Sequence, residues 1–180
     1  MVELRYFNHS DFQQLMSWVD SHAFSLQWSG SSLNYPLDEQ QLTRYVNNAN
    51  QPHSENLIYK AVDKETNKVV GHISLGKINR KNKTARICRI LVGDEKSRGK
   101  GIGTAMIQEI LHIAFKELGL HKVSLAVYDF NHSALACYKK VGFVTEGFIR
   151  ECTKFNDAYW SYWEMSMLEN EWHELNKEQG

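Results

Sequence analysis

A glycine-rich segment at residues 98–104, RGKGIGT, most strongly restricts what this chain can fold into and bind. Glycine reaches backbone conformations that other residues avoid, and it lets the chain pass close to a ligand. Residues 84–92 before the segment are typical of a strand, and residues 104–118 after it carry apolar side chains at helical spacing. The first amides of such a helix have no partner within the helix. The sequence therefore predicts a strand–loop–helix unit that can hold a phosphate or pyrophosphate.

Two common phosphate-binding loops fit this segment poorly. A P-loop has four residues between its first glycine and Gly-Lys-Ser/Thr, whereas five residues separate Gly93 from Gly99, and Gly101 occupies the Ser/Thr position. A dinucleotide-binding loop requires a third glycine, but that position holds Thr104 or Met106, depending on which glycine comes first. The spacing excludes the P-loop and weakens the dinucleotide interpretation.

The residues before the loop predict helices followed by a meander of strands. Residues 2–7 are typical of a short strand, and Ser10 is the expected N-cap of a first helix that starts at Asp11. Residues 21–35 show no clear period and are expected to form a loop, after which Pro36 opens a second helical pattern. Polar turns then separate three expected antiparallel strands, at residues 57–62, 69–78 and 84–92.

The residues after the loop predict a parallel unit. An alternating segment at residues 122–128 follows the expected helix, and a strand–helix–strand connection makes its two strands parallel. The rest of the chain predicts a helix, two further strands and a short terminal helix, at residues 133–141, 143–149, 158–168 and 171–180. No repeat or linker divides the chain, so we expect a single α/β domain over residues 1–180, built on a mixed sheet.

Composition narrows the classes of partner. Lys+Arg and Asp+Glu both number 21, so the formal net charge is zero and no overall field attracts nucleic acid or a membrane. The three cysteines form no short motif, and the eight histidines form no grouping with them, so we expect no metal. No signal peptide or bilayer-spanning apolar run is evident, which favours a cytoplasmic location.

A second motif lies at residues 131–143, NHSALACYKKVGF. With Arg98-x-x-Gly101-x-Gly103, it resembles the paired signatures of the GNAT superfamily of acyl-CoA-dependent N-acyltransferases. Within it, the general architecture resembles the subgroup with ribosomal-protein N-terminal and spermidine acetyltransferases. The resemblance implies a GNAT fold, with a mixed and mostly antiparallel central sheet of about six or seven strands and helices on both faces. It also implies a parallel, splayed pair of strands at the acetyl-CoA site.

The resemblance implies direct transfer of an acetyl group from acetyl-CoA to a primary amine of a small molecule or of a peptide N-terminus. In such a mechanism a backbone amide near Val92 polarises the thioester carbonyl, and Tyr138 protonates the departing thiolate. Asn131 is expected to order water or the coenzyme. The implied coenzyme-binding residues are Ile90, Leu91, Val92, Arg98, Gly99, Lys100, Gly101, Ile102, Gly103, Thr104, Asn131, Ala134 and Tyr138.

The general base is the open question in this sequence. Many family members carry a glutamate on the strand that here spans residues 84–92, which contains no carboxylate. The substitutes are Glu151, His72, Asp94, Glu95 or a chain of waters, of which Glu151 is our catalytic candidate. An α-amino acceptor would relax the requirement, because its pKa of about 7.7–8.0 is lower than the lysine value of about 10.4.

Trp28 and Tyr35 are the expected contributors to the acceptor pocket. The neutral net charge does not favour a polycationic acceptor, and the habit of the family favours a homodimer through the late strands. Two alternatives are an acyltransferase for a longer acyl-CoA and a non-catalytic acetyl-CoA-binding or sensing module. The module is suggested by the missing strand carboxylate and opposed by the presence of Tyr138.

Overall fold

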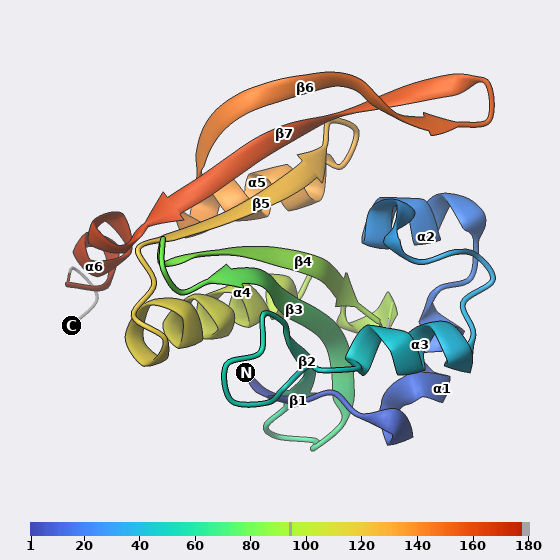
Figure 1. The fold of residues 1–180 in the computed structure, drawn as a ribbon, viewed down its shortest axis with the longest axis horizontal. Coiled ribbons are helices and arrows are strands. Elements are labelled where there is room, and N and C mark those ends of the chain that lie inside the picture. Colours follow the sequence, from blue (N-terminus) through green and yellow to red (C-terminus); the bar gives the residue numbers. More distant parts are fainter. Residues whose placement is uncertain (94, 178–180) are drawn as a thin grey trace.

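The computed structural model describes residues 1–93 and 95–177, which are arranged around one seven-stranded sheet (Figure 1). The strand order is β1-β2-β3-β4-β5-β7-β6, and all neighbouring pairs are antiparallel except the parallel pair of β4 and β5. This confirms the expected mixed sheet with one parallel pair. The strands are β1 (Val2–Tyr6), β2 (Leu57–Asp63), β3 (Val69–Asn79), β4 (Thr84–Val92), β5 (Lys122–Tyr128), β6 (Val144–Phe155) and β7 (Ala158–Leu168).

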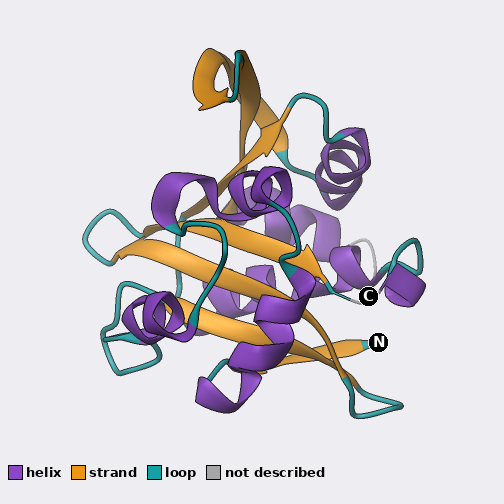
Figure 2. Cartoon of the chain, turned by 90° about the vertical axis from the view of Figure 1, so that its right-hand side faces the viewer, coloured by secondary structure: helices purple, strands orange, loops and turns teal. Residues whose placement is uncertain are grey.

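Helices cover both faces of the sheet (Figure 2). The helix α4 continues into a π-helical turn at Ile113–Glu117, and short 3-10 turns occur at His9–Asp11, Gly30–Ser32 and Glu95–Ser97. Among the described residues, no helix is long and apolar enough to cross a membrane. The α-helices are α1 (Phe12–Trp18), α2 (His22–Ser29), α3 (Glu39–Val46), α4 (Ile102–His112), α5 (His132–Val141) and α6 (Glu169–Lys177).

Two apolar cores lie on opposite faces of the sheet, as the alternation along β2 shows. Leu57 and Tyr59 belong to the core that contains Met106 and Ile110 of α4, whereas Ile58 between them belongs to the core under α1, α2 and α3. Successive side chains of a strand point to opposite faces, so α4 packs on one face and α1–α3 pack on the other. The second core is made of Phe7, Phe12, Leu15, Val19, Trp28, Leu37, Leu42, Ala49, Ile58 and Leu91.

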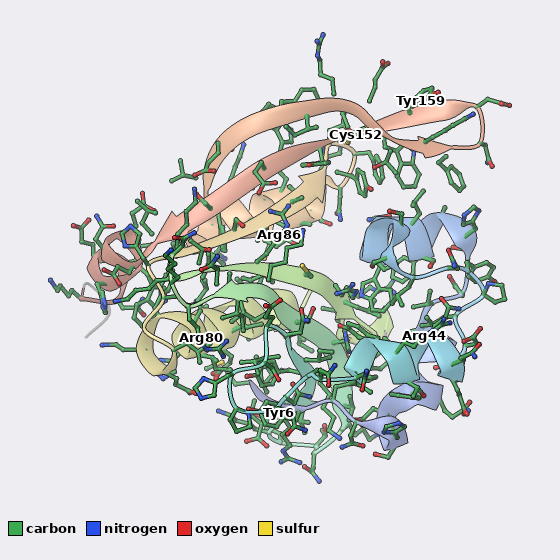
Figure 3. The ribbon with its side chains drawn as sticks, in the orientation of Figure 1. Tyr6, Arg44, Arg80, Arg86, Cys152 and Tyr159 are labelled. Atoms are coloured by element: carbon green, nitrogen blue, oxygen red, sulfur yellow. The ribbon has the colours of Figure 1, made fainter. Side chains whose placement is uncertain are left out.

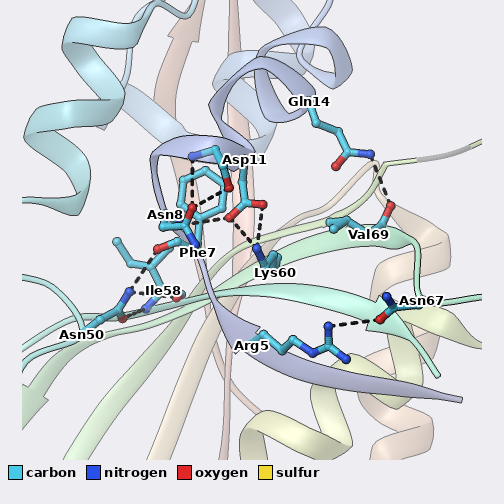
Figure 4. A network of polar contacts seen from close by, with 11 residues as sticks. Arg5, Phe7, Asn8, Asp11, Gln14, Asn50, Ile58, Lys60, Asn67 and Val69 are labelled. Atoms are coloured by element: carbon cyan, nitrogen blue, oxygen red, sulfur yellow. Dashed lines mark hydrogen bonds and ion pairs between the residues drawn. The ribbon is translucent and has the colours of Figure 1, made fainter.

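The segment before α1 is tied to β2 by polar contacts (Figure 4). Asp11 is buried and pairs with Lys60 at 2.8 Å, while its other oxygen accepts the backbone N–H of Asn8 at 2.9 Å. The Asn50 side chain bonds the backbone of Phe7 and of Ile58. These bonds satisfy buried polar groups and hold α1 and α3 against one face of the sheet.

Two local predictions near the N-terminus were wrong. The first helical turn is capped by Asn8, whose side chain accepts the N–H of Ser10, so Ser10 is not the cap. Part of the segment 21–35 is the helix α2, capped by Ser21, and not a loop. Its buried positions are Ser25 and Trp28, so a serine occupies the inner stripe and hides the apolar period.

Other helix and strand boundaries also differ from the predicted ones. α3 begins after Asp38, whose side chain caps it, and not at Pro36. α4 begins at Ile102, within the glycine segment, because Gly101 is its N-cap. β6 runs on to Phe155 instead of ending at residue 149, because its polar outer half extends beyond the core with almost every side chain exposed. The terminal helix is confirmed over Glu169–Lys177, and residues 178–180 lie outside the described part.

Candidate active site

The parallel strands β4 and β5 pair only at their beginnings. Their paired positions are Thr84 with Lys122, Ala85 with Val123 and Arg86 with Ser124. β4 then continues to Val92 and β5 to Tyr128 without further pairing between them. The strands therefore splay, as expected, and the sheet opens in the middle between its two halves.

A cavity of about 800 Å³ occupies this opening. Ile87–Val92 of β4 and Ala126–Tyr128 of β5 form its sides. α4 and α5 contribute from one face of the sheet, and Phe24 and Trp28 of α2 contribute from the other. Groups from both faces of the sheet therefore line the cavity.

The glycine segment forms one wall of the cavity. Gly99 and Gly101 have φ values of +75° and +79°, which favour glycine, and a Cβ atom at either position would meet nothing within 4 Å. Gly101 caps α4 without a side-chain hydrogen bond. The first amides of α4, at Ile102, Gly103 and Thr104, are therefore left to bind a ligand at the positive end of the helix dipole. The local geometry fits an anion.

Residues of α5, which packs beside α4, form another wall of the cavity. Asn131 caps α5, with its side-chain oxygen accepting the N–H of Ala134 at 3.3 Å, and Thr104 Oγ1 lies 3.2 Å from Cys137 Sγ. Tyr138 is 7% exposed and lines the cavity, and its hydroxyl has no hydrogen-bond partner among the described residues. Burial raises the pKa of Tyr138, so the phenol stays protonated at neutral pH.

The structure brings almost all of the expected coenzyme-binding residues to this one cavity. Only Lys100 of that group is absent from the lining, and Trp28 of the expected acceptor residues is present in it. Tyr35 lies elsewhere, with its hydroxyl donating to the Asp20 carbonyl at 2.9 Å. The lining residues that were expected are Ile90, Leu91, Val92, Arg98, Gly99, Gly101, Ile102, Gly103, Thr104, Asn131, Ala134, Tyr138 and Trp28.

The structure does not bring the candidate bases to the cavity. Glu151 is exposed on β6, where its backbone N–H donates to Ser161 Oγ at 2.9 Å. His72 is buried on β3, and its Nε2 lies 3.1 Å from the hydroxyl of Tyr45. Neither residue lines the cavity. Asp94 and the side chain of Glu95 lie outside the described part of the chain.

His72 makes a testable contribution to stability. Burial, and then the charge of Arg89, lower the pKa of His72 to about 3, against about 6.5 when unfolded. Below pH 6.5 the unfolded chain therefore takes up a proton that the folded chain does not, so stability falls as the pH drops. Between pH 7 and pH 4 the free energy of unfolding should fall by about 3 kcal/mol more in the wild type than in His72→Leu.

Urea unfolding at several pH values measures this difference. A matched control is His112→Gln, which changes an exposed histidine of α4 and should keep the wild-type pH dependence. Parallel pH profiles for the wild type and His72→Leu would contradict the burial of a neutral His72.

Several cavity residues were not expected from the sequence. Cys88 and Arg89 reach the cavity where β4 bulges, since its register against β3 shifts and Arg89 has a φ of +53°. Tyr128 comes from β5.

A sequence model described as the acetyltransferase (GNAT) family matches residues 15–143, well over half of the chain. The chain belongs to this family. It is an acyl-CoA-dependent N-acetyltransferase, and it carries the GNAT fold that its splayed strands and glycine loop already indicated.

Named relatives agree with this assignment. The prophage-derived, uncharacterized N-acetyltransferase YokL of Bacillus subtilis strain 168 is 32% identical over 129 residues, which are 72% of this chain and 70% of that protein. The spermidine N(1)-acetyltransferase of Vibrio cholerae is 31% identical over 104 residues, or 58% of this chain and 59% of that protein. The crystal structure of a Vibrio cholerae spermidine N-acetyltransferase in complex with CoA and spermine matches with a TM-score of 0.81 and 23% identity. That match covers 96% of this chain and 98% of the other, and it shows the same fold.

Proposed function

We propose that the cavity binds acetyl-CoA with its phosphates on the glycine segment and its pantetheine arm between the splayed strands. The main observation in support of this proposal is that twelve of the thirteen expected coenzyme-binding residues, all but Lys100, line this one cavity. Free amides at the start of α4 suit the phosphates, and the unpaired stretch of β4 offers backbone groups to the amide groups of the arm. The Vibrio neighbour, described as a complex with CoA, supports this placement.

The acetyl group would then lie between β4 and Tyr138. In the proposed reaction the acceptor nitrogen attacks the thioester carbonyl, forming the new C–N bond. A backbone N–H of the segment Ile90–Val92 stabilises the oxyanion. The C–S bond then breaks, and the Tyr138 hydroxyl gives its proton to the departing sulfur. Its raised pKa keeps that proton available at neutral pH, and its hydroxyl has no competing partner among the described residues.

The acceptor is a primary amine, and it must lose its proton before it attacks. For an amine of lysine-like pKa, about one molecule in a thousand is neutral near pH 7.4. No carboxylate of the described residues lines the cavity, and His72 lies outside it. We therefore propose that water carries the proton away and that Glu151 is not the base, because it is exposed on β6.

Release of CoA thiol from acetyl-CoA, measured with a panel of amines, tests the reaction directly. Titration calorimetry with acetyl-CoA tests the binding site separately. Binding with thiol release dependent on an amine is the expected result. If acetyl-CoA binds but no amine causes thiol release, and Tyr138→Phe binds acetyl-CoA as the wild type does, the chain is instead the non-catalytic acetyl-CoA-binding module.

The homodimer expected from the habit of the family would use β6 and β7. Their hairpin carries exposed apolar side chains at Val144, Phe148, Ile149 and Tyr159. In Figure 3 the labelled Tyr159 lies on this hairpin, away from the body of the sheet. Sedimentation of the purified chain would test this assembly.

A further inference from the structure

Arg89 is a half-buried cation with no counter-ion among the described residues. It lies at the bulge of β4 and lines the cavity. One Nη2 donor bonds Ser32 Oγ at 2.8 Å, and the guanidinium carbon lies 4.5 Å from the centre of the Tyr45 ring. The Nε donor is buried and has no acceptor. No carboxylate among the described residues pairs with Arg89.

Neighbouring Arg86 shows how this chain normally treats such a charge. Both of its terminal nitrogens bond the carboxylate of Glu164, so its charge is neutralised within the protein. Figure 3 shows Arg86 in the region between β4 and the outer strands. Enclosed charges in proteins are generally paired, because leaving one unpaired costs free energy. Arg89 departs from this rule, which indicates that a ligand supplies its anion.

The charge of the cavity as a whole points the same way. Its described lining contains four cations and no carboxylate, and the four are Lys77, Arg86, Arg89 and Arg98. Glu164 offsets Arg86, and Arg98 belongs to the glycine segment, where the coenzyme phosphates are proposed to bind. Lys77 is exposed to solvent, so Arg89 is the half-buried cation of the described lining that neither the protein nor the phosphate site accounts for.

Arg89 also lies on the side of the sheet away from α4. Its contacts are Ser32, which follows α2, and Tyr45 of α3, and both helices cover the face opposite to α4. The coenzyme phosphates are proposed at the start of α4, so the second substrate enters the cavity from the α2 side. The anion that meets Arg89 therefore belongs to the acceptor.

We propose that the acceptor amine carries an anionic oxygen group, a carboxylate or a phosphate, and that Arg89 binds this group. The proposal rests on the acetyl-CoA site described above and names the class of its second substrate. A free amino acid, an aminoalkyl phosphate or a peptide N-terminus beside an acidic side chain fits this class. A polyamine does not, because its ammonium groups would meet cations and no carboxylate in the described lining of the cavity.

The same charge assists the chemistry. A nearby positive charge disfavours the ammonium form of the bound acceptor and lowers the pKa of its amine. A larger fraction of the acceptor is then neutral and able to attack. Arg89 would thereby reduce the need for a general base, whose absence from the described cavity lining is otherwise unexplained.

Matched acceptors differing only in the anion test the proposal. Thiol release from acetyl-CoA is measured with amino acids of several side-chain sizes against their primary amides, and with phosphoethanolamine against ethanolamine. Peptides with aspartate or asparagine at the second position, and spermidine, complete the panel. At least one anionic member should exceed its neutral partner in kcat/KM by about 10- to 100-fold, as expected for one charge-assisted contact. The pair that responds distinguishes a carboxylate from a phosphate.

Arg89→Gln should bring that ratio close to one, and Arg89→Lys should restore part of it. Arg44→Gln is the matched control, because Arg44 is exposed on α3 outside the cavity (Figure 3) and its loss should leave the ratio unchanged. Calorimetry with acetyl-CoA on each variant confirms that the folded coenzyme site is intact.

Each possible failure has a distinct meaning. A preference for spermidine or for the neutral partners would overturn the anionic acceptor while leaving the coenzyme site standing. Survival of the anionic preference in Arg89→Gln would remove Arg89 as its cause. Failure to bind acetyl-CoA would instead refute the proposed coenzyme site, on which this inference depends.

Discussion

Replacing Tyr138 with phenylalanine is expected to lower kcat by about 10²- to 10⁴-fold and to leave the affinity for acetyl-CoA nearly unchanged. The substitution removes only the hydroxyl, which is the proposed proton donor to the departing sulfur. The hydroxyl bonds no other described residue, so its loss leaves no buried group unpaired. The phenylalanine ring keeps the contact with Phe143, whose ring centre lies 6.1 Å from that of Tyr138.

The pH profile of kcat is a second test of the proposal that Tyr138 acts as a neutral proton donor. The phenol acts as a donor only while neutral, and burial raises its pKa above the ordinary value of about 10. A raised pKa extends the neutral range upward, so ionisation of Tyr138 should cause no loss of kcat between pH 7 and pH 10. An alkaline loss within that range that disappears in Tyr138→Phe would contradict a neutral, buried donor.

Steady-state thiol release, with single-turnover measurements to isolate the chemical step, gives these constants. Tyr159→Phe is the matched control, since Tyr159 is 55% exposed on β7 and does not line the cavity. It should retain the wild-type kcat. An equal kcat in Tyr138→Phe and Tyr159→Phe would show that the thiolate leaves without a protein acid.

Replacing Gly101 with valine is expected to weaken acetyl-CoA binding by about 100-fold or more. Gly101 has a φ of +79°, which a β-branched residue avoids, so the cap of α4 must rearrange. A side chain there would also point into space that the phosphates are proposed to use, because nothing in the protein lies within 4 Å of the added Cβ. Losing two charge-assisted hydrogen bonds to phosphate costs about 3 kcal/mol or more, which corresponds to that factor.

Gly119→Val is the matched control that separates the loss of coenzyme contacts in Gly101→Val from the effect of backbone strain. Gly119 also has a positive φ, +61°, and open space at its Cβ position, but it does not line the cavity. Both variants should lose stability to a similar degree, and only Gly101→Val should lose affinity in calorimetry with acetyl-CoA. Undiminished binding of acetyl-CoA by folded Gly101→Val would refute the proposal that the glycine segment binds the phosphates.

Much of the coenzyme side of this site could be predicted from residues close together in the chain. The glycine loop and the first turn of α4 depend on local backbone conformation, and Asn131, Ala134 and Tyr138 lie within two turns of α5. Such features follow from residue type and short spacing, which a sequence displays directly. The parallel direction of β4 and β5 also followed from the strand–helix–strand connection, and their pairing confirms it.

The acceptor side could not be predicted in this way. Arg89 reaches the cavity through a β-bulge, and a one-residue shift changes which face every later side chain meets. Glu151 was a candidate base because it is a carboxylate, but it is exposed on β6. Tyr35 was a candidate for the acceptor pocket because it is aromatic, but its hydroxyl donates to the Asp20 carbonyl outside the cavity. Helix α2, which supplies Phe24 and Trp28, was concealed by a buried serine in its inner stripe.

The sequence by itself determined the family, the sheet with its parallel pair, and the glycine loop before α4, since these depend on local spacing and on chain connectivity. Only the tertiary structure decided which charges share the cavity. It pairs Arg86 with Glu164, 78 residues away, and leaves Arg89 without a described carboxylate. Electrostatic balance depends on distances between residues far apart in the chain, and folding alone sets those distances.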